Sequence, residues 1–484
     1  MKLYNTLSKK TEDFFSKSTN VGLYVCGPTV YGDSHLGHAR CAVIFDVLYR
    51  YLLSQGYRVR YVRNITDVGH LTEDWKDKIL EKAKLEKLEP MEVAQKYTNS
   101  YHDNLKLLNC LPPSIEPTAS GHIIEQIEFI KEIIDHGFAY VSNGSVYFDV
   151  EKYSHTYPYS QLSGRSLDDP NKEGTRETQG QEEKKSPRDF ALWKKASPEH
   201  IMHWPSPWSE GFPGWHIECS AMSRKYLGEQ FDIHGGGLDL MFPHHEAEIM
   251  QGCSVSGLNP ARYWVHCNLI TINGNKMGKS YNNFITMNQL FSGELELLGG
   301  RAFNPMALRL FILMANYKSP LDFSVPALDA AESGFLRLNE AYKKLKTTDW
   351  KVSQAENTEL SGKIRYIITE CGAALCNDLD TPKLVSSLLE AAKVINQLEK
   401  PSVKDLKGLN TIFEKFAVGV LGLAFNTEDK VVTKAFMGAL DILLNIRLRL
   451  KEAKNYEVSD EIRKDLEALG FTIKDGIDKT DWSL

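Results

Sequence analysis

Residues 21–55, VGLYVCGPTVYGDSHLGHARCAVIFDVLYRYLLSQ, predict the unit from which the fold is built. Residues 21–26 are a short β-rich apolar run that ends at Gly27-Pro28, as expected for a buried strand. From residue 39 to residue 55 the apolar side chains recur at three- and four-residue spacing, which is typical of a helix. The stretch therefore predicts a strand, a polar turn and a helix, the beginning of an α/β domain.

The same alternation continues through the first 300 residues. Further strands are predicted at residues 57–65, 144–150 and 263–268, with a mainly helical pattern at 90–140 that the prolines of 110–117 interrupt. Asn273-Gly274 predicts a tight hairpin turn within residues 269–275. The polar run 164–189 predicts a mobile surface loop, which we interpret as a solvated linker without a function.

From about Pro305 the pattern becomes helical and remains so. Helices are predicted at residues 306–315, 327–346, 364–376, 384–398 and 431–451. A short amphipathic helix and an extended end are expected in residues 460–484. The chain thus combines an α/β half with an appended helical bundle.

The composition limits the classes of protein to which this chain can belong. With 484 residues and 42% hydrophobic content it exceeds the size of one core, so two or more domains are expected. The formal net charge of −6 means that a polyanionic partner must be met by local basic patches. Eight dispersed cysteines, no apolar leader and no membrane-spanning apolar run predict a cytoplasmic protein.

Polar side chains follow the first two predicted strands. Cys26 ends the strand at 21–26, and Thr66 follows the strand at 57–65. Ligands of open α/β sheets bind outside the carboxyl ends of the strands, so Cys26 is better placed for chemistry than a thiol in mid-helix. A packed thiol is the alternative for a lone cysteine.

His35 and His38 stand at the predicted N-terminus of the helix at 39–55. A helix N-terminus has unpaired amides and a positive dipole, and Gly37 would let a ligand approach the backbone, so this place suits nucleotide phosphates. A capping or core role for the two histidines is the alternative. The preceding strand and turn favour the phosphate site.

Residues 211–250 gather metal-binding side chains: Cys219, His244, His245, Glu246 and Glu248. His244 and Glu248 are four residues apart in a segment that Pro243 could open as a helix, so both would share one face. The order of residues differs from the zinc-protease pattern, and no two cysteines have the spacing of a structural zinc site. We expect a metal site that takes a further ligand from elsewhere in the chain.

Lys276 and Lys279 flank Gly278 in a loop that follows the predicted hairpin. Such a flexible cationic loop could close on a triphosphate and stabilise the charge that develops at a transferring phosphorus. Two lysines in a loop are otherwise usually solvated.

Several motifs together resemble one enzyme family. H-L-G-H at 35–38, K-M-G-K-S at 276–280 and the helical C-terminal half resemble the class I aminoacyl-tRNA synthetases. More narrowly, the cysteinyl-tRNA synthetases have motifs similar to YVCGPTVY at 24–31, SPRDFALWK at 186–194, GWHIECSAM at 214–222 and HGGGLDLMFPHHE at 234–246. The similarity covers nearly the whole chain.

This resemblance implies an architecture and a reaction. The architecture is a Rossmann-type nucleotide-binding catalytic domain at 1–304 with an inserted connective region at about 110–210, an α-helical stem-contact and anticodon-binding bundle at 305–425, and a C-terminal helix with a small tail at 426–484. The reaction is activation of L-cysteine with ATP and Mg²⁺ to cysteinyl-adenylate, followed by transfer to the terminal ribose of tRNA(Cys). We expect a monomer with no membrane partner.

The resemblance also implies one zinc ion per chain, bound by Cys26, Cys219, His244 and Glu248. Zinc favours thiolate sulfur and lowers the pKa of a coordinated thiol, so a cysteine substrate can bind it as thiolate. Serine cannot match that bond. A bond that only the correct substrate makes can remove the need for editing.

The remaining site residues follow from the same match. ATP phosphates and the developing charge would be held by His35, His38, Lys276 and Lys279, the amino-acid pocket would include Thr66 and Trp215, and the anticodon would be contacted by Tyr456 and Asp460. Gly278 departs from the serine that is usual in the family, so closing the loop costs more backbone entropy. Tyr456 replaces a frequent tryptophan, and Asp460 is equally well explained as a helix N-cap.

Two alternatives remain open at this point. One is a related ligase that joins cysteine to an amino sugar, although such enzymes lack the long helical end found here after Pro305. The other is a zinc hydrolase that uses His244, Glu248 and an activated water, which would leave H-L-G-H and K-M-G-K-S without a role.

Overall fold

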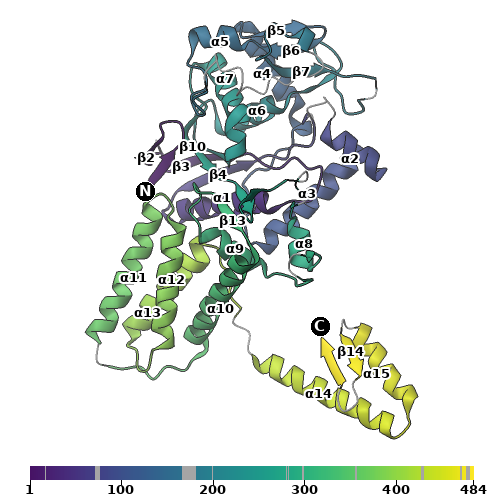
Figure 1. Cartoon of the computed structure of the whole chain (residues 1–484). Coiled ribbons are helices and arrows are strands. Elements are labelled where there is room, and N and C mark those ends of the chain that lie inside the picture. The colour runs from purple at the N-terminus through teal and green to yellow at the C-terminus, as the bar shows by residue number, and fades with distance from the viewer. Residues whose placement is uncertain are drawn as a thin grey trace. The chain divides into compact units, whose positions relative to one another are not determined.

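The computed structural model describes residues 1–484 except 17, 71–76, 166–180, 199, 279–280, 282, 297–298, 355–356, 427–429, 469–470, 476–479 and 484. The chain forms two compact units, Met1–Phe425 and Asn426–Leu484 (Figure 1). The domain boundaries predicted within the first unit stay predictions.

Parallel strands form the central sheet of the first unit. They are β3 (Asn20–Val25), β4 (Arg58–Arg63), β9 (Phe231–Gly237) and β10 (Ala261–Cys267), in the spatial order β10-β9-β3-β4. The α1 helix (Leu36–Ser54) joins β3 to β4 and buries its apolar face against the sheet and α9 (Pro305–Leu313). Because β4 and β9 lie on opposite sides of β3, the strand order reverses between β3 and β9, where open α/β sheets bind ligands. The strands predicted at 21–26, 57–65 and 263–268 are confirmed.

An antiparallel sheet with its own apolar core lies between β4 and β9 in the sequence. Its strands are β5 (Ala139–Ser142), β6 (Ser145–Phe148), β7 (Phe190–Lys195) and β8 (Gly211–Pro213). The helices α4 (Ile123–Asp135), α5 (Val150–Thr156) and α6 (Trp215–Leu227) accompany it at the top of Figure 1. Phe148 and Trp193 are fully buried in the core that these elements share.

The polar run at 164–189 is anchored at its C-terminal end. Asp189 is buried, and its carboxylate accepts hydrogen bonds from the Tyr140 hydroxyl at 2.7 Å and from the backbone N–H groups of Val150 and Ser186 at 3.1 Å. The interpretation of the run as a solvated linker is therefore wrong at Asp189, because its satisfied buried carboxylate ties the end of the run to the antiparallel sheet. Residues 166–180 lie outside the described part of the chain.

The predicted hairpin is confirmed as β11 (Ile270–Ile272) and β12 (Asn275–Lys276). Its turn residues Asn273 and Gly274 have φ angles of 49° and 77°, which matches the turn type that suits the twist of a hairpin. The β11 strand also pairs in parallel with β13 (Leu321–Phe323), which leads into the helical part of the unit.

The helical part of the first unit contains α9, α10 (Val325–Thr347), α11 (Thr358–Cys376), α12 (Thr381–Asn396) and α13 (Val403–Thr411), which continues as a π-helix at Ile412–Val420. The predicted helices at 306–315, 327–346, 364–376 and 384–398 are confirmed. The sequence does not predict α13, because VKDLKGLNT has few apolar residues and contains Gly408.

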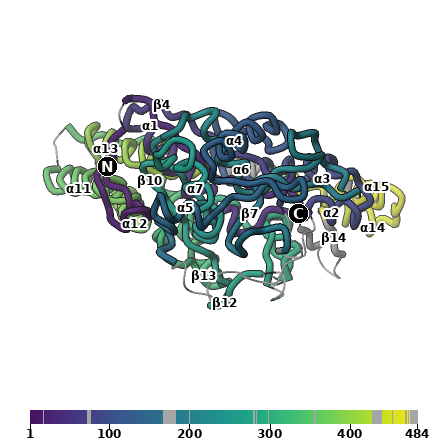
Figure 2. Tube along the Cα trace, turned by 90° about the horizontal axis from the view of Figure 1, so that it is seen from above, coloured from purple at the N-terminus to yellow at the C-terminus, as the bar shows by residue number. Residues whose placement is uncertain are grey.

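The chain start lies beside the end of α11. The backbone N–H of Tyr4 donates a hydrogen bond to Oδ1 of Asp378 at 2.7 Å, and Figure 2 shows the N-terminus next to the helical bundle. The other described elements are β1 (Lys2–Asn5), β2 (Lys10–Asp13), α2 (Lys78–Glu86), α3 (Pro90–Leu107), α7 (Glu246–Ser256) and α8 (Met287–Ser292).

The second unit pairs α14 (Lys430–Glu452) and α15 (Tyr456–Ala468) with a hairpin of β14 (Thr472–Asp475) and β15 (Thr480–Ser483). Leu440, Leu444, Leu466, Phe471 and Ile473 form its small core. The predicted helix at 431–451 is confirmed as α14.

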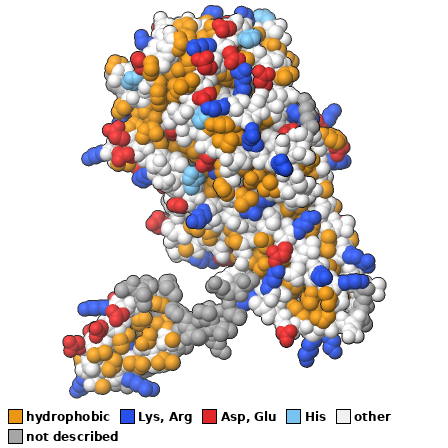
Figure 3. Space-filling view, turned by 180° about the vertical axis from the view of Figure 1, so that it is seen from behind, with side chains coloured by type: hydrophobic (Ala, Val, Ile, Leu, Met, Phe, Trp, Pro, Cys, Tyr) orange, Lys and Arg blue, Asp and Glu red, His pale blue; other side chains and the backbone are white. Residues whose placement is uncertain are grey.

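Within the described residues no helix combines the length and apolarity needed to cross a membrane. On the face drawn in Figure 3, basic and acidic side chains are interspersed.

Candidate active site and metal centre

A cavity of about 510 Å³ opens at the carboxyl ends of the central strands, where the strand order reverses. Most of the predicted site residues line it: Cys26, His35, His38, Thr66, Trp215, Cys219, His244 and Lys276. Glu248 is buried next to His244. Lys279 lies outside the described residues, and Tyr456 and Asp460 belong to the second unit.

Cys26, Cys219, His244 and Glu248 converge, with their possible ligand atoms all within 4.8 Å of one another. The Sγ atoms of Cys26 and Cys219 are 3.8 Å apart, and Oε1 of Glu248 is 3.8 Å from Cys26 Sγ and 3.2 Å from His244 Nε2. Ligands bonded at about 2.0–2.3 Å to one tetrahedral ion are roughly 3.3–3.8 Å from one another. These three separations therefore suit a tetrahedral zinc ion.

Separate elements bring these side chains together. Cys26 directly follows β3, and its backbone N–H donates to the carbonyl of Gly235 in β9 at 3.0 Å. Cys219 lies in α6. His244 belongs to a π-helical turn at Met241–His245, and Glu248 lies in the first turn of α7. The helix therefore begins after His245, later than Pro243, yet His244 and Glu248 still face each other as predicted.

The electrostatics of this cluster favour a cation. Burial, together with Cys219 and Glu248, raises the pKa of the Cys26 thiol well above its usual value, and burial raises that of Glu248. Burial and neighbouring histidines lower the pKa of His244, which keeps its ring neutral. A divalent cation would stabilise the anionic forms that burial disfavours and would accept the neutral imidazole.

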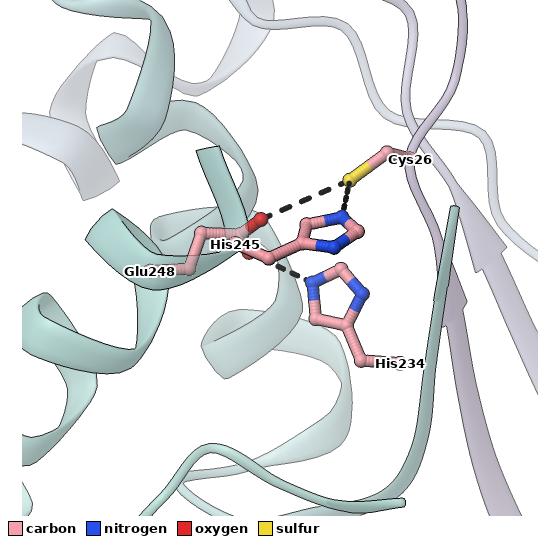
Figure 4. Close-up of side chains that lie close together, drawn as sticks. All are labelled: Cys26, His234, His245 and Glu248. Atoms are coloured by element: carbon pink, nitrogen blue, oxygen red, sulfur yellow. Dashed lines mark hydrogen bonds and ion pairs between the residues drawn. The ribbon is translucent and has the colours of Figure 1, made fainter. Parts of the chain in front are cut away.

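Histidines that are not among the four expected zinc ligands lie beside the cluster, as Figure 4 shows for His234 and His245. Nε2 of His245 is 3.3 Å from Cys26 Sγ, and Nε2 of His234 is 2.8 Å from Oε2 of Glu248. The possible ligand atoms of Cys26, His234, His245 and Glu248 also lie within 4.8 Å of one another. The 2.8 Å separation, however, is that of a hydrogen bond and is shorter than the edge of a tetrahedral site, so His234 orients the carboxylate.

The neighbours of His244 have distinct roles. Nδ1 of His216 is 2.9 Å from Nδ1 of His244, which leaves Nε2 of His244 as the atom that faces Glu248. Glu246 points away from the cluster, since Oε1 accepts hydrogen bonds from the backbone N–H groups of Leu162 and Ser163, both at 2.7 Å. Neither the support by His216 nor that by His234 could be inferred from sequence spacing.

His35 and His38 cap the N-terminus of α1. Nδ1 of His35 accepts a hydrogen bond from the Gly37 N–H at 3.1 Å, and Nδ1 of His38 accepts one from the His35 N–H at 3.3 Å. Burial lowers the pKa of His38 to about 4, so this ring is neutral at pH 7. A neutral imidazole that accepts at Nδ1 carries its proton on Nε2, so both rings have an Nε2–H donor. The capping role and the phosphate role are thus compatible.

Gly37 is required by the cap itself. A Cβ atom at this position would lie 2.9 Å from Cε1 of His35, which is closer than a carbon–carbon contact allows. The imidazole of His35 therefore lies over Gly37, the residue at which the sequence predicted that a ligand could approach the backbone.

Thr66 and Trp215 both line the cavity, with different surroundings. The Thr66 hydroxyl donates to Oε2 of Glu218 at 2.9 Å and accepts a hydrogen bond from Nδ2 of Asn64 at 3.1 Å. Trp215 is half-buried at the start of α6, and its ring stacks on His244 with centroids 4.5 Å apart. The indole is thus a wall of the cavity beside the proposed metal ligand.

The loop after β12 is closed by the side chain of Asn283. Its Nδ2 donates to the carbonyl of Lys276 and its Oδ1 accepts from the Gly278 N–H, both at 2.9 Å. Gly278 is therefore part of a defined turn.

Lys276 is exposed, and its positive charge opposes the rise that burial causes in the pKa of Asp239.

Tyr456 and Asp460 both lie on α15. Tyr456 is exposed at the first helical position, and Asp460 is exposed inside the helix. Asn455 occupies the capping position, where its Oδ1 accepts a hydrogen bond from the Val458 N–H at 3.5 Å. The N-cap alternative for Asp460 is therefore wrong, whereas its role towards tRNA stays a prediction.

Comparison with known proteins places these features in one family. The family model of the class I (C) tRNA synthetase catalytic domain matches residues 14–333. The cysteine–tRNA ligase of Bacteroides fragilis is 54% identical over 491 residues, which cover 100% of this chain and 98% of that protein. The cysteine–tRNA ligase of Thermus thermophilus is 44% identical over 489 residues, covering 100% of this chain and 99% of that protein.

A solved structure shares the fold at low identity. The Mycobacterium tuberculosis methionyl-tRNA synthetase bound by methionyl-adenylate superimposes with a TM-score of 0.55 and 11% identity, covering 85% of this chain and 99% of that chain. This similarity supports the class I fold.

Proposed function

The chain belongs to the cysteine–tRNA ligase family of the class I aminoacyl-tRNA synthetases, and from this we propose which of its residues carry out each part of the reaction. The enzyme joins cysteine to tRNA. The amino-sugar ligase and zinc hydrolase hypotheses are wrong, because full-length relatives are cysteine–tRNA ligases.

In this proposal Cys26, Cys219, His244 and Glu248 hold one zinc ion. Their near-tetrahedral separations, and a donor set of two thiols, an imidazole and a carboxylate, support zinc. When bound there, zinc supplies a Lewis acid that prefers the thiolate of cysteine to the hydroxyl of serine.

The surrounding histidines hold these ligands in place. His216 fixes the ring of His244, His234 donates to Glu248, and His245 lies against the Cys26 sulfur. Hydrogen bonds of this kind set the orientation and basicity of metal ligands. The proposed discrimination between thiol and hydroxyl thus depends on side chains beyond the four ligands.

ATP, accompanied by Mg²⁺, binds at the N-terminus of α1 in this proposal. The Nε2–H groups of His35 and His38 donate to phosphate oxygens, and the helix dipole adds a positive field. Lys276 and Lys279 close over the phosphates from the loop after β12 and stabilise the charge that develops at the α-phosphorus.

Cysteine lies between the metal cluster and this phosphate site, beside Thr66 and Trp215. Its carboxylate attacks the α-phosphorus, the bond to pyrophosphate breaks, and cysteinyl-adenylate forms. The terminal ribose hydroxyl of the tRNA then takes the acyl group and AMP leaves. Because the substrates supply both nucleophiles, the protein acts by positioning and electrostatic stabilisation.

For the tRNA we propose that Tyr456 and Asp460 contact anticodon bases. Both side chains are exposed on α15 near its N-terminus, where an aromatic ring can stack and a carboxylate can accept hydrogen bonds from base edges. We further propose that the enzyme acts as a monomer in the cytoplasm.

The observation that carries the proposal is one cavity whose wall combines Cys26, Cys219 and His244 with the histidine-capped start of α1. The test is ATP–pyrophosphate exchange driven by cysteine or by serine, with and without a zinc chelator, followed by charging of purified tRNA(Cys). We expect exchange with cysteine only, and its loss on chelation. Full activity and undiminished selectivity after complete removal of zinc would contradict the metal assignment.

A further inference from the structure

Lys78 and His70 form a contact in the wall of the active-site cavity that the reaction as described does not use. Both residues line the cavity. Nζ of Lys78 lies 2.7 Å from Nε2 of His70, and the backbone N–H of Lys78 donates to the carbonyl of His70 at 3.1 Å. The two residues are therefore held together through both main chain and side chain.

The surrounding backbone keeps this contact in place. Asp77 caps α2 by accepting hydrogen bonds from the N–H groups of Ile79 and Leu80 through Oδ1, and through Oδ2 it accepts the Gly69 N–H at 3.1 Å. Gly69 has a φ of +79°, and a Cβ there would lie 2.5 Å from the carbonyl oxygen of Pro213. The segment before His70 thus packs directly against the chain that leads into Trp215.

The contact determines the tautomer of His70. An ammonium group only donates hydrogen bonds, so Nε2 of His70 must accept from Lys78 and the ring proton must be on Nδ1. Nδ1 is 2.6 Å from the Thr29 hydroxyl, to which it donates. Burial and the charge of Lys78 lower the pKa of His70 to about 3, so the ring stays neutral.

The His70 ring begins a stack that ends at a proposed metal ligand. Its centroid is 4.3 Å from that of Trp215, with the planes 13° apart. Trp215 also stacks on His244, with centroids 4.5 Å apart and the planes 26° apart. The indole therefore stacks on two imidazoles, and the hydrogen bonds of His70 fix the orientation of the ring that is not a proposed metal ligand.

We propose that Lys78 and His70 are positioning residues of the amino-acid pocket: Lys78 fixes the tautomer and plane of His70, and His70 holds the Trp215 indole against His244. This inference rests on the proposed function, in which Trp215 is a wall of the cysteine pocket. Removing Lys78 weakens cysteine binding more than ATP binding, because the stack faces the metal cluster while ATP is held at α1.

Lys78→Met tests this in cysteine-dependent ATP–pyrophosphate exchange by the full-length protein. We expect the KM for cysteine to rise about tenfold, with the KM for ATP changed less than about twofold. Lys78→Arg, which keeps a charged donor, recovers most of the loss. Lys84→Met is the matched control on the same helix, because Lys84 is exposed and pairs only with Glu81 among the ion pairs of the described residues, and it leaves both constants unchanged.

A double-mutant cycle with Trp215→Phe separates positioning from general stability. If Lys78 acts through the indole, adding Lys78→Met to Trp215→Phe raises the cysteine KM much less than it does in the unmodified protein. The inference is overturned if the two substitutions raise the cysteine KM independently, so that their fold-changes multiply. It is also overturned if Lys78→Met raises the KM values for cysteine and for ATP equally. His70→Asn removes the ring that stacks on Trp215 and is the second variant to measure if Lys78→Met folds poorly. We expect the cysteine KM of His70→Asn to rise as it does for Lys78→Met. An unchanged cysteine KM in His70→Asn also overturns the inference.

The outcomes distinguish this inference from the function on which it rests. An unmodified protein without cysteine-dependent exchange overturns the proposed function and the inference together. A normal unmodified enzyme whose Lys78→Met variant keeps its cysteine KM overturns the inference alone.

Discussion

Sγ of Cys26 lies 3.8 Å from Sγ of Cys219, although 193 residues separate the two cysteines in the sequence. The first directly follows β3 of the central sheet, and the second lies in α6, after the antiparallel sheet. The inserted segment between them therefore returns the chain to the same point of the cavity. The proposed metal site depends on this return.

Cys219→Ala should abolish stoichiometric zinc binding. Loss of one thiolate leaves three ligands and a buried carboxylate without its cation, so we expect metal content to fall from about one ion per chain to well below half. Metal analysis of the purified protein measures this. Cys371→Ala is the control, because Cys371 is a buried free cysteine of α11 and should leave the zinc content unchanged.

His234→Phe should weaken zinc binding without removing a proposed ligand. The variant deprives Oε2 of Glu248 of its donor, and loss of such an outer hydrogen bond typically costs about 10- to 100-fold in metal affinity. Competition with a chromogenic chelator gives the dissociation constant. His136→Phe, at an exposed position after α4, serves as the comparison, and equal affinities of the two variants would contradict an orienting role.

Gly278→Ser should speed amino-acid activation. Serine has less backbone freedom than glycine in the open loop, so closing the loop costs less, by about 0.4–1 kcal/mol. We expect the exchange rate to rise about two- to fivefold. The hydrogen bond from the residue 278 N–H to Asn283 remains possible. A slower serine variant would show that the turn here needs a glycine.

His266→Gln should make the stability of the zinc-free protein less sensitive to acid. Burial and the nearby His234 lower the pKa of His266 to about 3, whereas an unfolded histidine takes up its proton near pH 6.5. Its contribution to stability is therefore present above about pH 6.5 and is lost progressively as the pH falls towards 3.

Glutamine does not titrate, so this variant should lose less stability between pH 7 and pH 5, by an amount on the order of 1–2 kcal/mol. The midpoint of thermal unfolding should show the difference as a few degrees. Identical pH profiles of the two proteins would mean that His266 is protonated in both states or in neither.

Arg309→Met should strongly destabilise the first unit. The buried guanidinium donates to the carboxylate of Asp46 and to the carbonyls of Leu108 and Leu421, the latter two at 2.6 Å, and so joins α1 to the helical part. Removing one partner of a buried ion pair typically costs about 3–5 kcal/mol. The thermal midpoint should drop by several degrees.

The matched surface change is Arg301→Met, because Arg301 pairs with Asp329 at half-exposed positions. Exposed pairs contribute about 0–1 kcal/mol, so this variant should unfold close to the unmodified protein. Similar losses in the two variants would contradict a special role for the buried pair.

Local patterns were sufficient for much of the fold. The strand, turn and helix at 21–55, the Asn273-Gly274 hairpin and the helices α9 to α12 follow from apolar spacing and turn residues, because these signals act over a few residues. Two features were missed because the predictions relied on local patterns. The helix α13 has few apolar residues, and Asp189 is held by partners on another part of the sheet.

The sequence by itself determined the fold class and the candidate phosphate-binding residues, because strand ends and helix starts are local properties. The set of four proposed zinc ligands followed from the family resemblance that the sequence motifs carry. Only the tertiary structure decided which neighbours surround them. His234 meets Glu248 and Lys78 meets His70 because packing brings strand ends and helix starts to one point, and no spacing along the chain specifies such a meeting.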